Sequence, residues 1–136
     1  VTQKEFLMIL SNITDRYYTP YITEDSTQEE IDEMYKQLIR KGIVKEREKD
    51  PDAVITREDA VKFIIRALNY DKVADIRSIF IVSFEDAEDI AYELKGYVAI
   101  ASGLKIISGS GGKFYPKREL TRAEAAVMIY NCLSLN

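Results

Sequence analysis

The sequence predicts an all-α domain in which helix–loop–helix repeats pack around a central bundle of three capped helices. Two observations predict this class. A Thr-x-x-acid motif opens three apolar stretches of helical periodicity, and a second helical pattern recurs between them. The 136 residues suffice for one domain with a hydrophobic core. We expect a single domain over 1–136, with a degenerate unit at 1–54, a second unit at 55–108 and a third unit at 109–136.

The first helix type is marked by a threonine with an acidic residue three positions later. The hydroxyl and the acid form a capping box, and each cap contributes about 1 kcal/mol. Apolar residues then follow on one face of a helix. The predicted helices run over 2–14, 56–69 and 121–134, with stripes of Phe6, Leu7 and Leu10, of Val61, Ile64 and Leu68, and of Ala126, Ile129 and Leu133. Because no stripe can be buried alone, we expect these helices to bury one another at the centre.

The second helix type has apolar residues at positions i, i+3, i+4 and i+7. It predicts helices over 27–41 and 86–103, which we expect to pack outside the central three. Between them, 72–82 fits a short helix followed by an extended segment, and periodicity alone does not separate the two. The loop at 108–116 contains three of the six glycines, whereas the loop at 45–54 has none and is predicted to be a solvated charged turn.

Composition excludes several classes of function. The chain has no histidine, which removes Ser-His and Cys-His catalysis and His-ligated zinc. The single cysteine, Cys132, allows no internal disulfide, and we expect it to be a core residue. The formal net charge of −4 argues against a nucleic-acid partner, and no apolar run is long enough to insert into a membrane. We therefore expect the chain to have no enzymatic activity, no metal site and no cofactor. The acidic clusters at 29–33 and 85–89 are predicted to lie in first turns of helices.

Capping accounts for the threonines and the acids but not for Arg57 and Arg122, which follow two of the threonines. A cation at a helix start is unfavourable by about a few tenths of a kcal/mol. These arginines therefore indicate either a ligand or a surface ion pair with a nearby carboxylate. Residues 105–122 carry five basic residues and one acid, a local charge of +4. This segment is either an anion-binding turn, through its loop amides and arginine, or a solvated basic turn.

The glycine-rich turn, its Phe-x-Pro ending and the Leu-Thr-Arg-Ala-Glu helix start of residues 107–126 resemble the signature of the S-layer homology (SLH) family. Phe-Glu-Asp at 84–86 and Gly-Tyr-Val-Ala at 96–99 are similar to the other half of that signature. The resemblance is close over 84–133, good over 55–68 and faint over 1–54.

The resemblance implies three repeats in a pseudo-threefold arrangement and a non-catalytic role at the bacterial cell surface. It implies an extracellular location, at the cell wall or S-layer, and non-covalent binding of a secondary cell-wall polysaccharide, often pyruvylated, in grooves between repeats. Arg57 and Arg122 would then contact ligand acid groups, and Asp86 would form the opposite wall. The other residues that the family motif assigns to binding are Gly109, Gly111, Gly112, Thr121 and Glu124.

Three departures from the family pattern affect this expectation. Gln3 replaces the arginine in the first segment, the loop at 45–54 lacks glycines, and Ile90 stands where many members have tryptophan. We therefore expect one or two working grooves, with Arg122 and its glycine loop the better candidate. The alternative is a degenerate protein–protein assembly module that does not bind glycan. Such a module would self-associate through the incomplete repeat, the unit whose first helix has no partner helix before it in this sequence. Tyr17, Tyr18 and Tyr21 either stack on sugar rings or pack between helix and loop.

Overall fold

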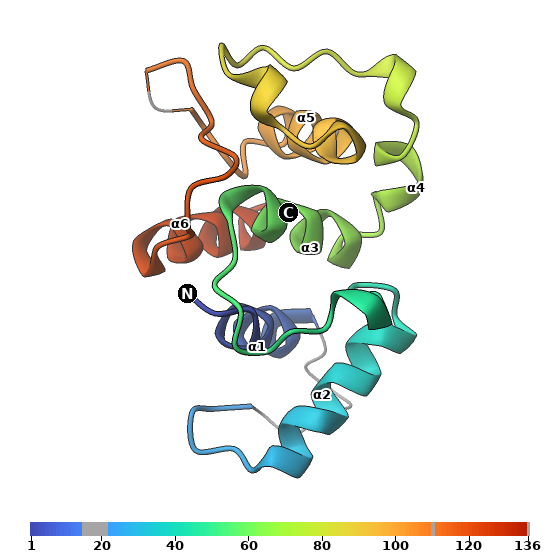
Figure 1. Cartoon of the computed structure of the whole chain (residues 1–136), viewed down its shortest axis with the longest axis vertical. Coiled ribbons are helices and arrows are strands. Elements are labelled where there is room, and N and C mark those ends of the chain that lie inside the picture. Colours follow the sequence, from blue (N-terminus) through green and yellow to red (C-terminus); the bar gives the residue numbers. More distant parts are fainter. Residues whose placement is uncertain (15–21, 110, 136) are drawn as a thin grey trace.

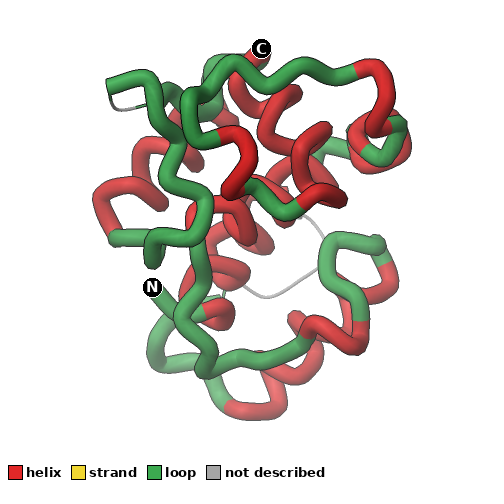
Figure 2. The backbone as a smooth tube through the Cα atoms, turned by 45° about the horizontal axis from the view of Figure 1, so that its top comes forward, coloured by secondary structure: helices red, strands yellow, loops and turns green. Residues whose placement is uncertain are grey.

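The computed structural model describes residues 1–14, 22–109 and 111–135, and within them the fold is entirely helical (Figures 1 and 2). Two isolated bridges, between Thr2 and Val54 and between Thr56 and Glu119, are the extended pairings in this part of the chain. The predicted all-α class is confirmed. No helix of the described residues is long and apolar enough to cross a membrane. The α-helices are α1 (Gln3–Thr14), α2 (Gln28–Arg40), α3 (Arg57–Ala67), α4 (Asp71–Ala74), α5 (Lys95–Gly103) and α6 (Arg122–Leu133).

The three predicted caps are present at the starts of α1, α3 and α6. In each, the threonine hydroxyl accepts a hydrogen bond from the backbone N–H three residues later, at 3.1 to 3.3 Å. Asp59, although shorter than glutamate, completes the box at Thr56. A fourth box, from Thr27 to Glu30, starts α2. These caps satisfy amides that would otherwise lack partners in the first helical turn.

A closed ring of backbone hydrogen bonds joins the residues that precede the three caps. The N–H of Ile55 donates to the carbonyl of Val1 at 3.1 Å, and that of Leu120 donates to Ile55 at 2.9 Å. The amino group of Val1 donates to the carbonyl of Leu120 at 3.1 Å, which closes the ring. The N-terminus accordingly lies between α1 and α6 in Figure 1. The ring fixes the starts of three helices that are far apart in the sequence.

The predicted apolar stripes are buried on two of the three central helices. Phe6, Leu7 and Leu10 of α1 and Val61 and Ile64 of α3 are fully buried. The stripe of α6 differs from the prediction, because Ala126 is exposed, Leu133 is 44% exposed and only Ile129 is buried. No described helix covers that face of α6, which opens onto a groove shared with α1. α2 packs against α1, and α5 packs against α3.

The helix predicted over 86–103 begins nine residues later than expected, at Lys95. Two short 3₁₀ turns, Ala87–Asp89 and Tyr92–Leu94, precede it, with extended backbone between them. This break buries Ile90 and lets the N–H of Ala91 donate to the Glu58 carboxylate at 3.1 Å. The ambiguous segment 72–82 contains α4, which ends at Ala74, and a 3₁₀ turn over Arg77–Ile79.

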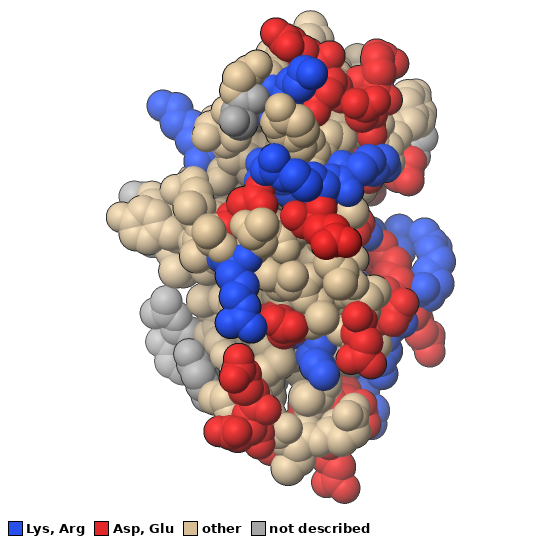
Figure 3. Space-filling model, turned by 60° about the vertical axis from the view of Figure 1, so that its left-hand side comes forward, with Lys and Arg blue, Asp and Glu red and all other residues tan. Residues whose placement is uncertain are grey.

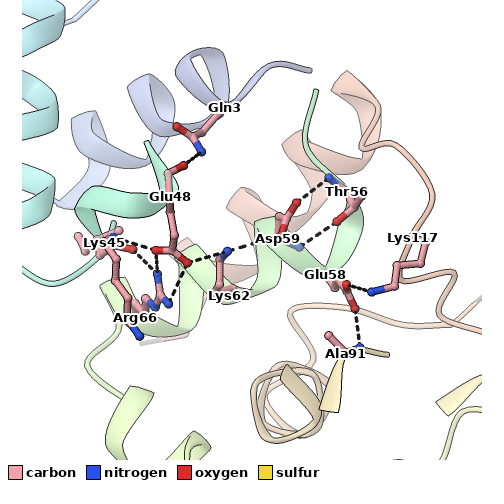
Figure 4. Close-up of polar contacts among 11 residues, drawn as sticks. Gln3, Lys45, Glu48, Thr56, Glu58, Asp59, Lys62, Arg66, Ala91 and Lys117 are labelled. Carbon is pink, nitrogen blue, oxygen red and sulfur yellow. Dashed lines mark hydrogen bonds and ion pairs between the residues drawn. The ribbon is translucent and has the colours of Figure 1, made fainter. Parts of the chain in front are cut away.

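The loop at 45–54 is largely exposed, as its charges predict, but one of its carboxylates is turned inward. Its Glu48 accepts two hydrogen bonds from the Arg66 guanidinium, at 2.6 and 3.2 Å, and lies 3.0 Å from Lys62. Figure 4 shows this carboxylate turned inward against α3. The loop contains a 3₁₀ turn, Glu46–Glu48, closed by a hydrogen bond from the N–H of Lys45 to Glu48. The Glu48 carboxylate therefore stabilises the fold through its contacts with Arg66 and Lys62 of α3.

We predict that Glu48→Gln removes part of the acid sensitivity of the fold. Burial raises the pKa of Glu48, but hydrogen bonds from Arg66, Lys45 and Lys62 outweigh burial and lower it from 4.5 to about 2. Because the pKa is lower in the folded state, the stabilisation is complete above pH 4.5 and is lost as the pH falls toward 2. The shift corresponds to about 3 kcal/mol. Urea denaturation of the variant between pH 2 and pH 6 should show a shallower dependence on pH.

The exposed neighbour Glu46 provides the matched control. Glu46→Gln should follow the parent protein over the whole pH range, since no buried cation among the described residues contacts that carboxylate. Equal pH dependence in the parent protein and Glu48→Gln would show that Glu48 does not carry the effect.

Candidate functional site

Arg57 lies inside the protein, at the junction of α3, α6 and the glycine-containing loop. The residue is 8% exposed, and its Nε donates to the carbonyl of Phe114 at 2.9 Å. The guanidinium lies 5.1 Å from the centre of the Phe114 ring, a cation–π contact. It also pairs with the carboxylate of Glu124 on α6. Two of the predicted site residues are therefore in direct contact. Arg57 pairs with a carboxylate, as the ion-pair interpretation expected, but inside the protein and not at its surface.

Asp86 organises the same loop from the other side. Its two carboxylate oxygens accept hydrogen bonds from the N–H groups of Phe114, at 2.9 Å, and Tyr115, at 2.7 Å. Burial raises the pKa of Asp86, but these amide hydrogen bonds lower it by more, so the net pKa is below the ordinary value. Its position in an acidic cluster predicted that Asp86 lies in the first turn of a helix, and this prediction is wrong. Asp86 fixes the backbone on which Arg57 rests.

The glycines allow the loop to pack closely. A Cβ atom at Gly109 would lie 2.6 Å from the Phe84 ring and 2.8 Å from the carbonyl of Lys113. Gly111 and Gly112 have φ angles of +61° and +85°, which side-chain-bearing residues rarely adopt. The Phe84 ring stacks on Phe114 at 5.6 Å between ring centres. The three predicted glycines therefore shape the turn that presents Phe114 to Arg57.

Carboxylates from other elements neutralise much of the local charge of +4. Lys117 pairs with Glu58 of α3, and Arg118 pairs with Glu124 at 2.9 Å. Figure 3 shows basic side chains lying directly against acidic ones across the middle of this face. The description of residues 105–122 as a solvated basic turn is therefore incomplete. Lys117 and Arg118 are paired in this way, and both side chains remain more than half exposed.

Two shallow clefts border this cluster. One, of about 200 Å³, lies between α6 and the loop after α5, and its lining includes Arg57, Ser108 and Glu124. The other, of about 310 Å³, is lined by Asp86, Asp89 and residues 115–118. The glycine-containing loop separates the clefts at positions 109 and 111–114. The smaller cleft is thus lined by the buried Arg57, and the larger one by the exposed Lys117 and Arg118.

Arg122 lies at a different place. Its side chain is 81% exposed, and its guanidinium is 3.7 Å from the Glu5 carboxylate of α1. It borders an open groove of about 660 Å³ between α1 and α6. The arginine that contacts the glycine-containing loop is Arg57, so the predicted partnership of Arg122 with that loop is not what the structure shows. Thr121 caps α6 beside it.

Gln3 takes the position in α1 that Arg57 holds in α3. Its side chain donates to the carbonyl of Glu48 at 2.8 Å and accepts from the N–H of Asp50 and from the Tyr35 hydroxyl, both at 2.9 Å. A neutral amide thus replaces the guanidinium and still holds the neighbouring loop. The sequence analysis did not identify Tyr35 or Glu48 as site residues. Their partners lie far away in the sequence, so no local pattern points to them.

Other predicted features lie outside this cluster. Tyr17, Tyr18 and Tyr21 fall outside the described residues. Cys132 is partly buried against the core, and burial raises the pKa of its thiol. Among the described residues, no group of three His, Cys, Asp or Glu side chains is arranged to hold a metal ion.

We predict that Arg57→Ala and Arg122→Ala differ strongly in stability. Removing the buried Arg57 leaves the Phe114 carbonyl without its side-chain donor and leaves Arg118 as the remaining cation on Glu124, which should lower the free energy of unfolding by about 2 kcal/mol. Removing the exposed Arg122 should cost less than about 0.5 kcal/mol. Urea denaturation at neutral pH measures both values. Similar costs for the two variants would contradict the burial difference.

Comparison with known proteins gives one family and two relatives. Residues 83–126 match the model of the S-layer homology domain. The chain is 30% identical over 139 residues to the amylopullulanase of Thermoanaerobacterium thermosulfurigenes, and 33% identical over 141 residues to the exoglucanase XynX of Acetivibrio thermocellus. Each alignment covers 98% of this chain but only 8% and 13% of the respective relative. The predicted resemblance is confirmed: the chain carries an S-layer homology domain, a cell-surface anchoring module.

Proposed function

We propose that this domain anchors the polypeptide that carries it to the bacterial cell wall by non-covalent binding of an anionic secondary cell-wall polysaccharide. A pyruvylated polymer is the ligand that the family resemblance favours. The location that follows is extracellular, at the cell wall or S-layer. No catalytic step is involved, and the module acts through binding alone.

One observation supports this proposal most strongly: two guanidinium groups share a single carboxylate. Arg57 and Arg118 both pair with Glu124, so two positive charges face one negative charge within this trio. Burial raises the pKa of Glu124, but hydrogen bonds from Arg118 and Thr121 and the charge of Arg57 lower it below its ordinary value, so the acid is ionised at neutral pH. An anionic sugar substituent would balance the remaining charge, and the planar arginine fork suits a carboxylate.

The cleft beside this cluster has the mixed surface that a sugar requires. Apolar side chains of Ile106, Val127 and Met128 line part of it, and the Ser108 hydroxyl lies at its edge. Apolar atoms can pack against the flat face of a sugar ring while polar groups bond its hydroxyls. Gly111 has open space beside its Cα, whereas the Phe84 ring packs against Gly109 and the Glu85 side chain packs against Gly112. In this proposal Arg57 binds from the wall of this cleft, Arg118 binds from the neighbouring cleft that it lines, and Asp86 holds the loop in place.

The remaining residues of the family motif belong to a second, separate position. Arg122 lines the groove between α1 and α6, which we propose as the second inter-repeat groove, and Thr121 caps the helix beside it. The division into units at 1–54, 55–108 and 109–136, and their pseudo-threefold arrangement, are part of the same proposal. The ring that joins Val1, Ile55 and Leu120 supports it, since each unit contributes one donor and one acceptor.

The alternative function, a protein–protein assembly module, is favoured by the apolar lining of that second groove. Such a lining suits a protein side-chain surface better than a hydroxyl-rich polymer. The two functions are compatible, because the two grooves border different residues of α6.

Binding to purified cell-wall sacculi tests the proposed function. We expect the domain to sediment with sacculi that retain the secondary polymer and to remain in solution after the polymer has been removed. Arg57→Gln combined with Arg118→Gln should weaken binding at least about tenfold, because two charge-assisted contacts are lost. Glutamine is the appropriate replacement at position 57, since Gln3 holds the equivalent position in α1.

Arg47→Gln is the matched control, because Arg47 is an exposed arginine on the loop at 45–54, away from the cleft. Circular dichroism should show that all variants are folded. Sedimentation that survives removal of the polymer, or a double variant that binds like Arg47→Gln, would refute the proposed function.

A further inference from the structure

The outer face of α2 carries a stripe of four charged residues. These residues, Glu29, Glu33, Lys36 and Arg40, are all exposed. Their spacing of four, three and four positions places them on one side of the helix. The four buried residues of α2 occupy the opposite side. Figure 1 shows α2 in the lower part of the molecule, away from α5 and α6.

The order of these charges, two acids followed by two bases, is only partly explained by the helix itself. Glu29 lies in the first turn and Arg40 in the last turn, where the helix dipole favours an acid and a base, respectively. Glu33 and Lys36 lie in the middle of the helix, where that effect has faded. Residues four positions apart have like charges, Glu29 with Glu33 and Lys36 with Arg40, and such pairs destabilise an isolated helix.

Neighbouring elements do not compensate these charges. None of the ion pairs among the described residues includes Glu29, Lys36 or Arg40. Glu33 accepts a hydrogen bond from the neutral side chain of Gln37 at 3.0 Å. The stripe therefore presents its charge to the surroundings of the molecule.

We propose that this stripe pairs with the same stripe of a second copy of the chain, in an antiparallel arrangement around a twofold axis. The axis would pass midway between Glu33 and Lys36. Glu33 of each copy then lies opposite Lys36 of the other, and Glu29 lies opposite Arg40. The register is symmetric because each outer residue lies four positions from its inner neighbour. Each ion pair occurs twice, along about 16 Å of helix.

The charge order identifies a second copy as the partner. A stripe of acid, acid, base and base is its own complement when it is read in the opposite direction. An anionic polymer would be attracted by Lys36 and Arg40 but repelled by the two glutamates, and a cationic partner would meet the reverse difficulty. No residue of α2 lines the two clefts or the groove between α1 and α6, so pairing leaves the proposed glycan sites open.

The contact is expected to be weak and sensitive to salt. Exposed ion pairs each contribute little, and the net charge of −4 makes the copies repel at long range. At an ionic strength of about 0.1 M this repulsion is screened beyond about 10 Å, whereas ion pairs in contact persist. We therefore expect a dissociation constant in the millimolar range. Such a contact is populated where copies are held close together on one surface.

Sedimentation equilibrium of the full chain at concentrations up to about 2 mM tests the proposal. Glu33→Lys places two lysines opposite each other on both sides of the axis and should weaken the pairing at least about tenfold. Glu46→Lys makes the same change of net charge at an exposed residue outside α2 and is the matched control. Its dissociation constant should stay within about twofold of the parent value.

A charge exchange separates the proposed pairing from a general effect of charge. Glu33→Lys combined with Lys36→Glu keeps the net charge of the parent chain and restores opposite charges across the axis. Pairing should then return to within about threefold of the parent value. Raising the ionic strength to about 1 M, where the screening length falls to about 3 Å, should dissociate the parent pair. Circular dichroism should show that all variants are folded.

The proposal is overturned if the parent chain stays monomeric at about 2 mM, well within the expected range of association. It is also overturned if Glu33→Lys and Glu46→Lys have equal effects, or if the charge exchange does not restore pairing. Self-association that persists at an ionic strength of about 1 M would place the contact on an apolar surface and would contradict pairing through α2.

Discussion

The structure depends on the ring of three backbone hydrogen bonds that joins Val1, Ile55 and Leu120. Each of these residues directly precedes a capping threonine, so the ring fixes where α1, α3 and α6 begin and how they face one another. Backbone groups buried at such a junction must pair with one another, because an unpaired N–H or carbonyl away from water is costly. Once the three helix starts are fixed, the loops that follow α2 and α5 must pass over the first turns of α1 and α3.

That constraint explains why the residue after each threonine matters. Gln3 and Arg57 lie under the passing loops and hold them with side-chain hydrogen bonds, one as a neutral amide and the other as a cation. A buried cation requires compensation, and the Phe114 ring, a carbonyl and Glu124 provide it. The same guanidinium therefore supports the fold and, in the proposed function, supplies positive charge to a sugar polymer. Arg122 lacks a covering loop among the described residues, and its side chain is correspondingly exposed.

Local sequence patterns predicted the parts of this structure that depend on neighbouring residues. The capping boxes and the apolar periodicity located α1, α2, α3 and α6 to within a few residues. The contacts of Arg57 could not be predicted in this way, because Glu124 lies 67 positions away in the sequence. Asp86 was misplaced for a similar reason, since its acidic neighbours fit a helix start while its partners, Phe114 and Tyr115, lie in another loop. The family resemblance selected Arg57 and Arg122 as candidate binding residues but did not indicate that one is buried and the other exposed.

Amide hydrogen exchange at the helix starts tests the central claim most directly. The ring predicts that the amides of Ile55 and Leu120 exchange only on global unfolding, with protection close to that of the core of α3. It also predicts that the amide of Arg122 exchanges orders of magnitude faster than that of Arg57, since only the latter donates to a loop carbonyl in the described part of the chain. Rapid exchange at Ile55 and Leu120, or equal protection of Arg57 and Arg122, would contradict the account.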